Sequence, residues 1–176
     1  MGDFIGTTIS GMTGRGSIRH NNRSFSAANI DRSRTEQNVT YCNDDLKQVY
    51  HEIFDEALAA YNAKKKKTRD KITDYYEHIR QGKQEKLFHE AIFQIGNLED
   101  CGCGSPGGER AAAALKEFAE SFQERNPHLR VFNMVLHMDE ATPHLHVDFI
   151  PVATEQSRGL STEGFHETGV EAAGSL

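Results

Sequence analysis

Three histidines lie close together near the end of the chain, in the segment 137–146. His137 ends a β-rich run, and His144 and His146 follow the turn-like sequence Met-Asp-Glu-Ala-Thr-Pro. Since alternate residues of a strand share a face, His144 and His146 point the same way, and His137 can join them from the neighbouring strand. Neutral imidazoles bind divalent transition metals well, and three protein ligands leave positions open for a substrate. The spacing therefore predicts a three-histidine metal site rather than three unrelated surface histidines.

Such a site requires two adjacent strands joined by a turn. Residues 131–137 and 144–150 are rich in Val, Leu, Phe and Ile, which is typical of strands. In the second strand, Leu145, Val147 and Phe149 fall on the side opposite the histidines. We expect these three side chains to point into a hydrophobic core.

Hydrophobic periodicity predicts the remaining elements. Residues 1–35 are expected to be irregular or to form short strands. In chain order, the other predicted elements are a strand at 36–42, a helix from Asn43 or Asp44 to about Asn62, a helix at 68–80, a strand at 87–95 and a helix at 109–125. Helices beside antiparallel strands predict an α+β fold, an antiparallel sheet with helices packed on one face.

The composition fits one domain with a core of Phe, Leu, Ile and Val, since the 176 residues include no Trp. No apolar run is long enough to cross a bilayer, and the N-terminus does not have the pattern of a secretory signal. Cys42, Cys101 and Cys103 are expected to be free thiols in a reducing compartment. We therefore expect a cytoplasmic protein.

Positive charge is concentrated in two places, although the net charge is −6. Five arginines lie within residues 15–34, and a run of four lysines, residues 64–67, follows the first long predicted helix. The net charge argues against a protein that coats nucleic acid, but local clusters can still bind phosphates. The lysine run has an equally good alternative, since positive charge suits the C-terminal end of a helix.

Three segments resemble a known family. The segment 137–146 resembles the histidine motif of plasmid mobilisation (Mob/Pre) relaxases of the MobV type, which are called plasmid recombination enzymes and belong to the HUH endonucleases. Arg19-His20-Asn21-Asn22-Arg23 resembles the N-terminal His-Asn-x-Arg element of that family, and residues 31–41 agree more loosely. The resemblance extends from about residue 10 to residue 160.

The resemblance implies an enzyme of plasmid mobilisation and conjugation. Such relaxases bind single-stranded DNA at a transfer origin, cut one strand by transesterification, stay joined to its 5′ end and later reseal it. A divalent cation, Mn²⁺ or Mg²⁺, would be held by His137, His144 and His146. It would neutralise the charge that grows on the scissile phosphate.

The resemblance also suggests the attacking group. His20 matches the histidine that is thought to be the nucleophile in the MobV type, and a neutral imidazole needs no strong base to activate it. Arg19 and Arg23 flank His20 and would favour its neutral form. Tyr41 is the second candidate nucleophile, and the pair Tyr75-Tyr76 is the third.

Two carboxylates in the histidine segment are assigned separate tasks. Glu140 is expected to orient a metal ligand or the nucleophile, whereas Asp139 is expected to cap the turn. Asp148 lies on the histidine side of its strand and can assist. The residues expected to contact DNA are Arg15, Arg19, Asn22, Arg23, Arg32, Arg34, Lys64, Lys65, Lys66 and Lys67.

The end of the chain departs from the family pattern. Residues 1–160 are expected to form the relaxase domain. Residues 161–176 are expected to be an aberrant or disordered tail, produced by a frameshift, in place of a C-terminal region through which the family forms homodimers. Two other functions stay open. One is a catalytically impaired single-stranded DNA-binding fragment, and the other is an unrelated three-histidine metal hydrolase.

Overall fold

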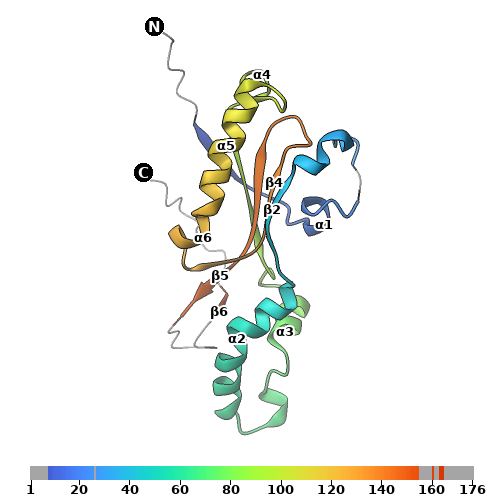
Figure 1. The fold of residues 1–176 in the computed structure, drawn as a ribbon. Helices are drawn as coiled ribbons and strands as arrows, with labels where there is room; N and C mark the ends of the chain where they lie inside the picture. The colour runs from blue at the N-terminus through green and yellow to red at the C-terminus, as the bar shows by residue number, and fades with distance from the viewer. Residues whose placement is uncertain (1–7, 26, 155–159, 161–162, 165–176) are drawn as a thin grey trace. The chain divides into compact units, whose positions relative to one another are not determined.

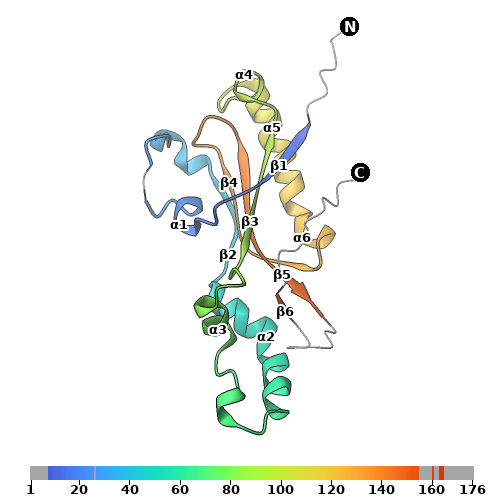
Figure 2. The same ribbon diagram turned by 180° about the vertical axis from the view of Figure 1, so that it is seen from behind.

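The computed structural model describes residues 8–25, 27–154, 160 and 163–164, and Figures 1 and 2 show it from opposite sides. The chain divides into two compact units. The first consists of Met1–Asp44 and Phe88–Phe149, and the second of Asp45–Leu87 and Ile150–Leu176. The first unit contains the histidine segment and the arginine-rich segment.

An antiparallel sheet forms the centre of the first unit. Its strands are β1 Ile9–Thr13, β2 Val39–Asn43, β3 His89–Ile95, β4 Leu129–His137 and β5 His144–Ala153. They are arranged in the order β1-β3-β5-β4-β2, so the two histidine-bearing strands are neighbours inside the sheet. The predicted α+β fold and the predicted strands at 87–95, 131–137 and 144–150 are confirmed.

One face of the sheet is apolar. Leu145 and Val147 of β5 are fully buried and belong to a core cluster with Leu136 of β4. Residues of α5 Pro106–Glu120 and α6 Phe122–Arg125 complete this cluster, among them Leu115 and Phe122. Figures 1 and 2 show α5 and α6 on one side of the sheet.

The helix α5 begins at a well-formed cap. The hydroxyl of Ser105 accepts a hydrogen bond from the amide of Gly108, and Pro106 takes the first helical position, where its missing N–H costs nothing. The helix predicted at 109–125 is therefore confirmed in position but starts earlier. It is interrupted at Ser121, whose hydroxyl donates to the carbonyl of Glu117 in the preceding turn. A short helix, α4 Leu98–Cys101, precedes it.

The N-terminal segment lies on the other face of the sheet. After β1 it forms α1 Ile18–Asn21, capped by Ser17, and the 3₁₀ helix η1 Arg32–Gln37, capped by Asp31. Figures 1 and 2 show α1 and η1 across the sheet from α5. The strand expected at 36–42 begins only at Val39, because the Asp31 cap winds the preceding residues into η1.

The second unit contains α2 Leu46–Ala63, η2 Thr68–Asp70 and α3 Tyr75–Gln81. Buried residues of α2 pack against α3 through aromatic contacts, such as that between Phe54 and Tyr75. The predicted cap at Asn43 or Asp44 is wrong. Asp45 accepts the capping hydrogen bond from the amide of Gln48, because Asn43 still belongs to β2.

Two further predictions about the second unit need adjustment. The helix expected at 68–80 is split into η2 and α3, because Asp74 caps a new helix at Tyr75. A short strand, β6 Glu163–Gly164, pairs with the end of β5. Apart from these two residues, the tail at 161–176 lies outside the described residues, so its predicted disorder stays a prediction. None of the helices in the described part of the chain is long and apolar enough to span a membrane.

Candidate functional site

The three histidines of the hairpin gather on the polar face of the sheet. The ring centroids of His137 and His146 are 4.6 Å apart, those of His144 and His146 are 5.0 Å apart, and those of His137 and His144 are 5.2 Å apart. The side chain of His137 is completely buried, and the other two are nearly so. The structure thus brings together the residues that the spacing selected.

Each imidazole directs one ring nitrogen away from the cluster, toward an oxygen. Nε2 of His137 lies 2.8 Å from the carbonyl oxygen of Asn21, and Nδ1 of His144 lies 2.8 Å from that of Thr142. Nδ1 of His146 lies 2.7 Å from a carboxylate oxygen of Glu90. Carbonyl and carboxylate oxygens only accept, so these three nitrogens carry the protons and each ring keeps a lone pair on its other nitrogen.

Two of the lone-pair nitrogens lie close together, and the third is left without a partner. Nδ1 of His137 and Nε2 of His144 are 3.3 Å apart, and Nε2 of His146 is buried without a hydrogen-bond partner. Burial lowers the pKa of His137 to about 2, and burial together with His146 lowers the pKa of His144, so a proton does not readily fill the space between them. Neutral imidazoles that are each oriented by an outward hydrogen bond are donors of the kind that suit a divalent cation.

The donors near this cluster form two overlapping sets among the described residues. In one set, nitrogens of His20, His137 and His146 lie within 4.8 Å of one another. In the other, a carboxylate oxygen of Glu140 and nitrogens of His137 and His144 lie within the same distance of one another, so His144 and His146 fall in different sets. His137 is common to both sets, and so it lies at the middle of the site.

Glu90 holds His146 in place. Besides the ring of His146, its carboxylate accepts hydrogen bonds from the amide of Gly16 and the side chain of Asn21. Burial opposes ionisation of Glu90, but these hydrogen bonds outweigh it and lower the pKa. A Cβ on Gly14 would lie 1.9 Å from a carboxylate oxygen of Glu90, so this glycine allows the backbone just after β1 to pass close to the carboxylate.

A second polar layer lies behind Glu90. Asp148 is fully buried and accepts hydrogen bonds from Asn21 and Asn133. Burial raises the pKa of Asp148 to about 6. The amide nitrogen of Asn21 donates to both Asp148 and Glu90, while its backbone carbonyl accepts from His137. Asn21 therefore connects the N-terminal helix to the histidine cluster.

His20 reaches the same site from α1. Its ring centroid lies 5.6 Å from that of His137 and 5.8 Å from that of His146. Its Nε2 is 3.3 Å from both Nη1 of Arg23 and Oε1 of Glu140. Burial, and then the positive charge of Arg23, lowers the pKa of His20, as expected for a group kept neutral. The side chain stays 23% exposed, which leaves it accessible to a substrate.

Arg23 and Asp139 form a buried ion pair beside His20. The guanidinium of Arg23 donates to both carboxylate oxygens of Asp139, to Glu140 and to the backbone carbonyl of His20. Thr35 also donates to Asp139. Burial disfavours the charge on Asp139, but the hydrogen bonds from Arg23 prevail and hold its pKa well below the usual range. The carboxylate of Asp139, which was expected only to cap the turn, therefore also holds Arg23 and Thr35 in place.

Glu140 lies between His20 and His144. Its Oε1 accepts a hydrogen bond from Arg23 at 2.8 Å and lies 3.3 Å from Nε2 of His20. Its Oε2 accepts from Asn29 and lies 3.9 Å from Nε2 of His144. Glu140 therefore contacts both the candidate nucleophile and a candidate metal ligand.

Tyr41 lies on the opposite face of the sheet. Its half-buried side chain packs against the apolar cluster that includes Leu115 and Phe122 of the covering helices. Burial, and then Glu120, raises its pKa. This position separates Tyr41 from the histidines by the thickness of the sheet. Tyr75 and Tyr76 belong to the second unit, where Tyr75 packs against Phe54.

The predicted DNA-contacting residues differ in exposure, in their partners and in the unit to which they belong. Arg15 and Arg19 are exposed. Arg34 is half-buried, pairs with Asp31 and donates to the carbonyl of Glu140, and Asn22 donates to Asn43. The remaining predicted contacts are Arg23 in the ion pair described above, exposed Arg32 in η1 and Lys64, Lys65, Lys66 and Lys67 after α2 in the second unit.

Sequence reasoning missed two residues that organise the site. Asn21 lies next to His20, and sequence reasoning assigned it no role of its own beyond membership of the N-terminal motif. Glu90 is a charged residue in the middle of an apolar strand, which is a signal that it faces a polar partner. Their partners lie far away along the chain, so hydrophobic periodicity could not identify them.

Comparisons with known proteins identify the family. The model of the Mob_Pre family, described as plasmid recombination enzyme, matches residues 17–168. That match includes the N-terminal motif and the histidine hairpin, and it reaches into the segment 161–176. No curated protein matches the chain.

Four solved structures are similar to the chain, and all are described as the MobM relaxase domain (MOBV; Mob_Pre) bound to plasmid pMV158 oriT DNA, with Mn bound. The structure at pH 5.5 is 23% identical, with 88% of this chain and 73% of that chain covered and a TM-score of 0.44. The structure at pH 4.6 is 21% identical, with 84% and 73% covered and a TM-score of 0.45. A complex with a 3′ thiophosphate is 22% identical, with 87% and 74% covered and a TM-score of 0.44. Because the family model spans nearly the whole chain, this protein belongs to the Mob_Pre family of plasmid recombination enzymes.

Proposed function

We propose that the chain is a plasmid mobilisation relaxase of the MobV type, which nicks and rejoins single-stranded DNA at a transfer origin through a covalent intermediate on its 5′ end. The observation that carries the proposal is that a cluster of three histidines lies beside a fourth histidine from the N-terminal segment. The rings of His137, His144 and His146 cluster together, and a fourth imidazole, that of His20, lies beside them with its ring nitrogen next to Arg23 and Glu140.

His137, His144 and His146 would hold the cation, which we propose to be Mn²⁺ or Mg²⁺. When bound, the cation would neutralise charge on the phosphate that is attacked. The outward hydrogen bonds to Asn21, Thr142 and Glu90 fix the orientation of the three rings and increase their basicity.

His20 is the proposed nucleophile. Its lowered pKa keeps the imidazole neutral, so the lone pair is available without a general base. A ring nitrogen would form a bond to phosphorus while the bond from phosphorus to the 3′ oxygen breaks. The proton on the other ring nitrogen would pass to solvent, and the 3′ oxygen would leave as a hydroxyl after taking a proton from water. Arg23 and Glu140 flank Nε2 and hold the ring in place.

The direct test is the covalent adduct. The full chain is incubated with Mn²⁺ and a labelled library of random single-stranded 40-mers, and adducts are recovered under denaturing conditions. We expect an adduct that is destroyed by mild acid, because a phosphorus–nitrogen bond is acid-labile, whereas a tyrosine phosphodiester survives.

Two histidine variants sharpen this test. His20→Ala should abolish the adduct but leave Mn²⁺ binding, whereas His51→Ala, which changes an exposed histidine of α2 paired with Asp55, should affect neither. An adduct that resists acid and persists in His20→Ala would overturn the assignment of His20. Cleavage without any adduct would favour a metal hydrolase, and binding without cleavage would favour a DNA-binding fragment.

A further inference from the structure

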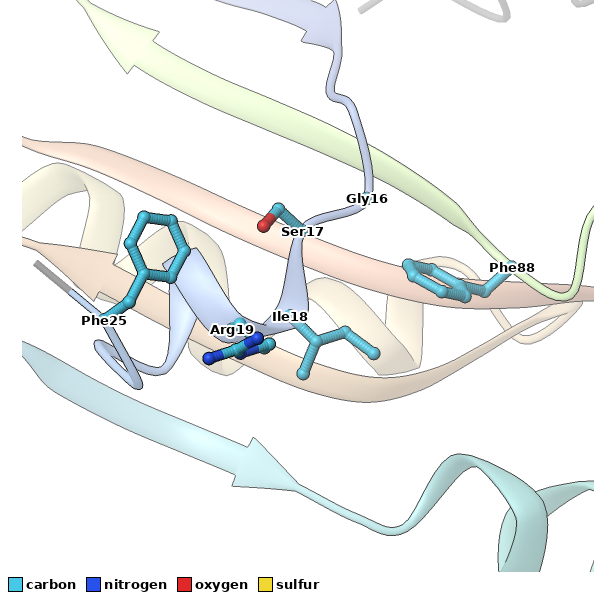
Figure 3. A pocket seen from close by; sticks show the side chains of 6 residues that line it. All are labelled: Gly16, Ser17, Ile18, Arg19, Phe25 and Phe88. Carbon is cyan, nitrogen blue, oxygen red and sulfur yellow. The ribbon is translucent and has the colours of Figure 1, made fainter. Parts of the chain in front are cut away.

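An open groove of about 470 Å³ lies next to α1, beside the site just described (Figure 3). Its lining residues are Gly16, Ser17, Ile18, Arg19, Phe25 and Phe88. In Figure 3, Phe25 and Phe88 lie at opposite ends, and Ser17, Ile18 and Arg19 lie between them. The groove thus combines two aromatic rings with one exposed arginine.

The two rings differ in how firmly they are held. Phe88 is half-buried and packs edge-on against Phe132, with ring centroids 5.2 Å apart. Gly16 also fits against it, since a Cβ on this residue would lie 3.1 Å from the ring, and its φ of +70° favours glycine. Phe25, in contrast, is 43% exposed, and its ring is available to an incoming group.

The groove lies next to the proposed nucleophile, although His20 does not line it. The ring centroid of Phe25 lies 6.0 Å from that of His20, and Arg19 is adjacent to His20 in α1. A DNA phosphate at His20 would therefore place the neighbouring nucleotide at this groove. Every nucleobase has an aromatic face that stacks on a phenyl ring, and a guanidinium binds phosphate.

We propose that this groove takes one unpaired nucleobase of the DNA strand, stacked on Phe25, while Arg19 binds an adjacent phosphate. The proposal rests on the proposed function, because it takes single-stranded DNA as the ligand. Stacking tolerates different bases, so the groove would position the strand at the cleavage site instead of reading its sequence.

Equilibrium binding of two probes of equal length tests the stacking. Fluorescence anisotropy is measured with the Mn²⁺-loaded full chain and either a 12-mer of thymidylate or an abasic 12-mer that keeps every phosphate. Phe25→Leu should weaken binding of the thymidylate 12-mer about tenfold, the effect of one lost stack, and leave the abasic 12-mer unchanged. Phe25→Tyr should behave as the wild type.

Two further variants serve as comparisons. Arg19→Ala should weaken both probes equally and reduce the slope of log Kd against log salt by about one. Leu98→Ala, which removes a 63% exposed side chain that does not line the groove, should change neither affinity. Melting temperatures of all variants are compared with that of the wild type.

The proposal is overturned if Phe25→Leu weakens both probes alike, or neither of them, or if the wild type fails to bind the thymidylate 12-mer. This result is independent of the adduct test. Binding is measured without cleavage, so a failed nucleophile assignment leaves the groove result intact, and the reverse also holds.

Discussion

The two faces of the sheet in the first unit are both buried, but different forces hold them together. On the helix-covered face, Leu136, Leu145 and Val147 are fully buried among apolar neighbours. On the other face, His137 and Asp148 are equally buried, yet they depend on directional hydrogen bonds to named partners. The apolar face can exchange one hydrophobic side chain for another of similar volume, whereas the polar face loses its arrangement when a single partner is removed.

The largest effect is expected from Arg23→Ala on the polar face. This change leaves the fully buried carboxylate of Asp139 without its ion-pair partner, which should lower the free energy of unfolding by about 3–5 kcal/mol. Urea denaturation measures the loss. Exposed Arg19→Ala should cost less than about 0.5 kcal/mol. If the double variant Arg23→Ala with Asp139→Asn recovers no stability, the unpaired charge is not the cause.

A comparable loss is expected on the apolar face, without damage to the proposed metal site. Leu145→Ala removes a fully buried side chain and should cost about 2–5 kcal/mol, depending on how far the cavity collapses. Because the neighbouring residues His144 and His146 point to the other face, the affinity for Mn²⁺, measured by calorimetry, should stay within about twofold of the wild type. A much larger fall in Mn²⁺ affinity would show that the two faces are coupled.

The smallest effect on stability, but a clear effect on the site, is expected for Glu90→Gln. The substitution keeps the size of the side chain and removes the charge that orients His146. Loss of such an outward partner typically lowers metal affinity 10- to 100-fold. Glu109→Gln, on the exposed side of α5, is the matched control. Equal Mn²⁺ affinity for Glu90→Gln and the wild type would contradict this assignment of Glu90.

The same contrast explains how much could be predicted from the sequence. The apolar face follows from local periodicity, so the strands at 131–137 and 144–150 and the helix at 109–125 were predicted close to their observed positions. Boundaries failed where one side chain decided them. Asp45 caps α2 in place of Asn43 or Asp44, and the cap at Asp31 winds η1 out of an expected strand.

The polar face was predictable only in part. The spacing of His137, His144 and His146 indicated their convergence, because the two strands are adjacent in the sequence. The contacts of Asn21 and Glu90 join residues that are 56 to 127 positions apart, and no local pattern reports such distances. The placement of His20 beside the histidines was suggested by family resemblance instead of by any feature of residues 1–35.

The hydrogen bond from Nε2 of His137 to the carbonyl of Asn21 links α1, the helix that carries His20, directly to the histidine cluster. A cation bound to the inner nitrogen of His137 would make its outer N–H more acidic. The hydrogen bond from this N–H to the backbone of Asn21 would then become stronger. Loading with Mn²⁺ should therefore slow deuterium uptake across residues 18–24, so that the segment carrying the proposed nucleophile becomes more rigid when the proposed cation is bound.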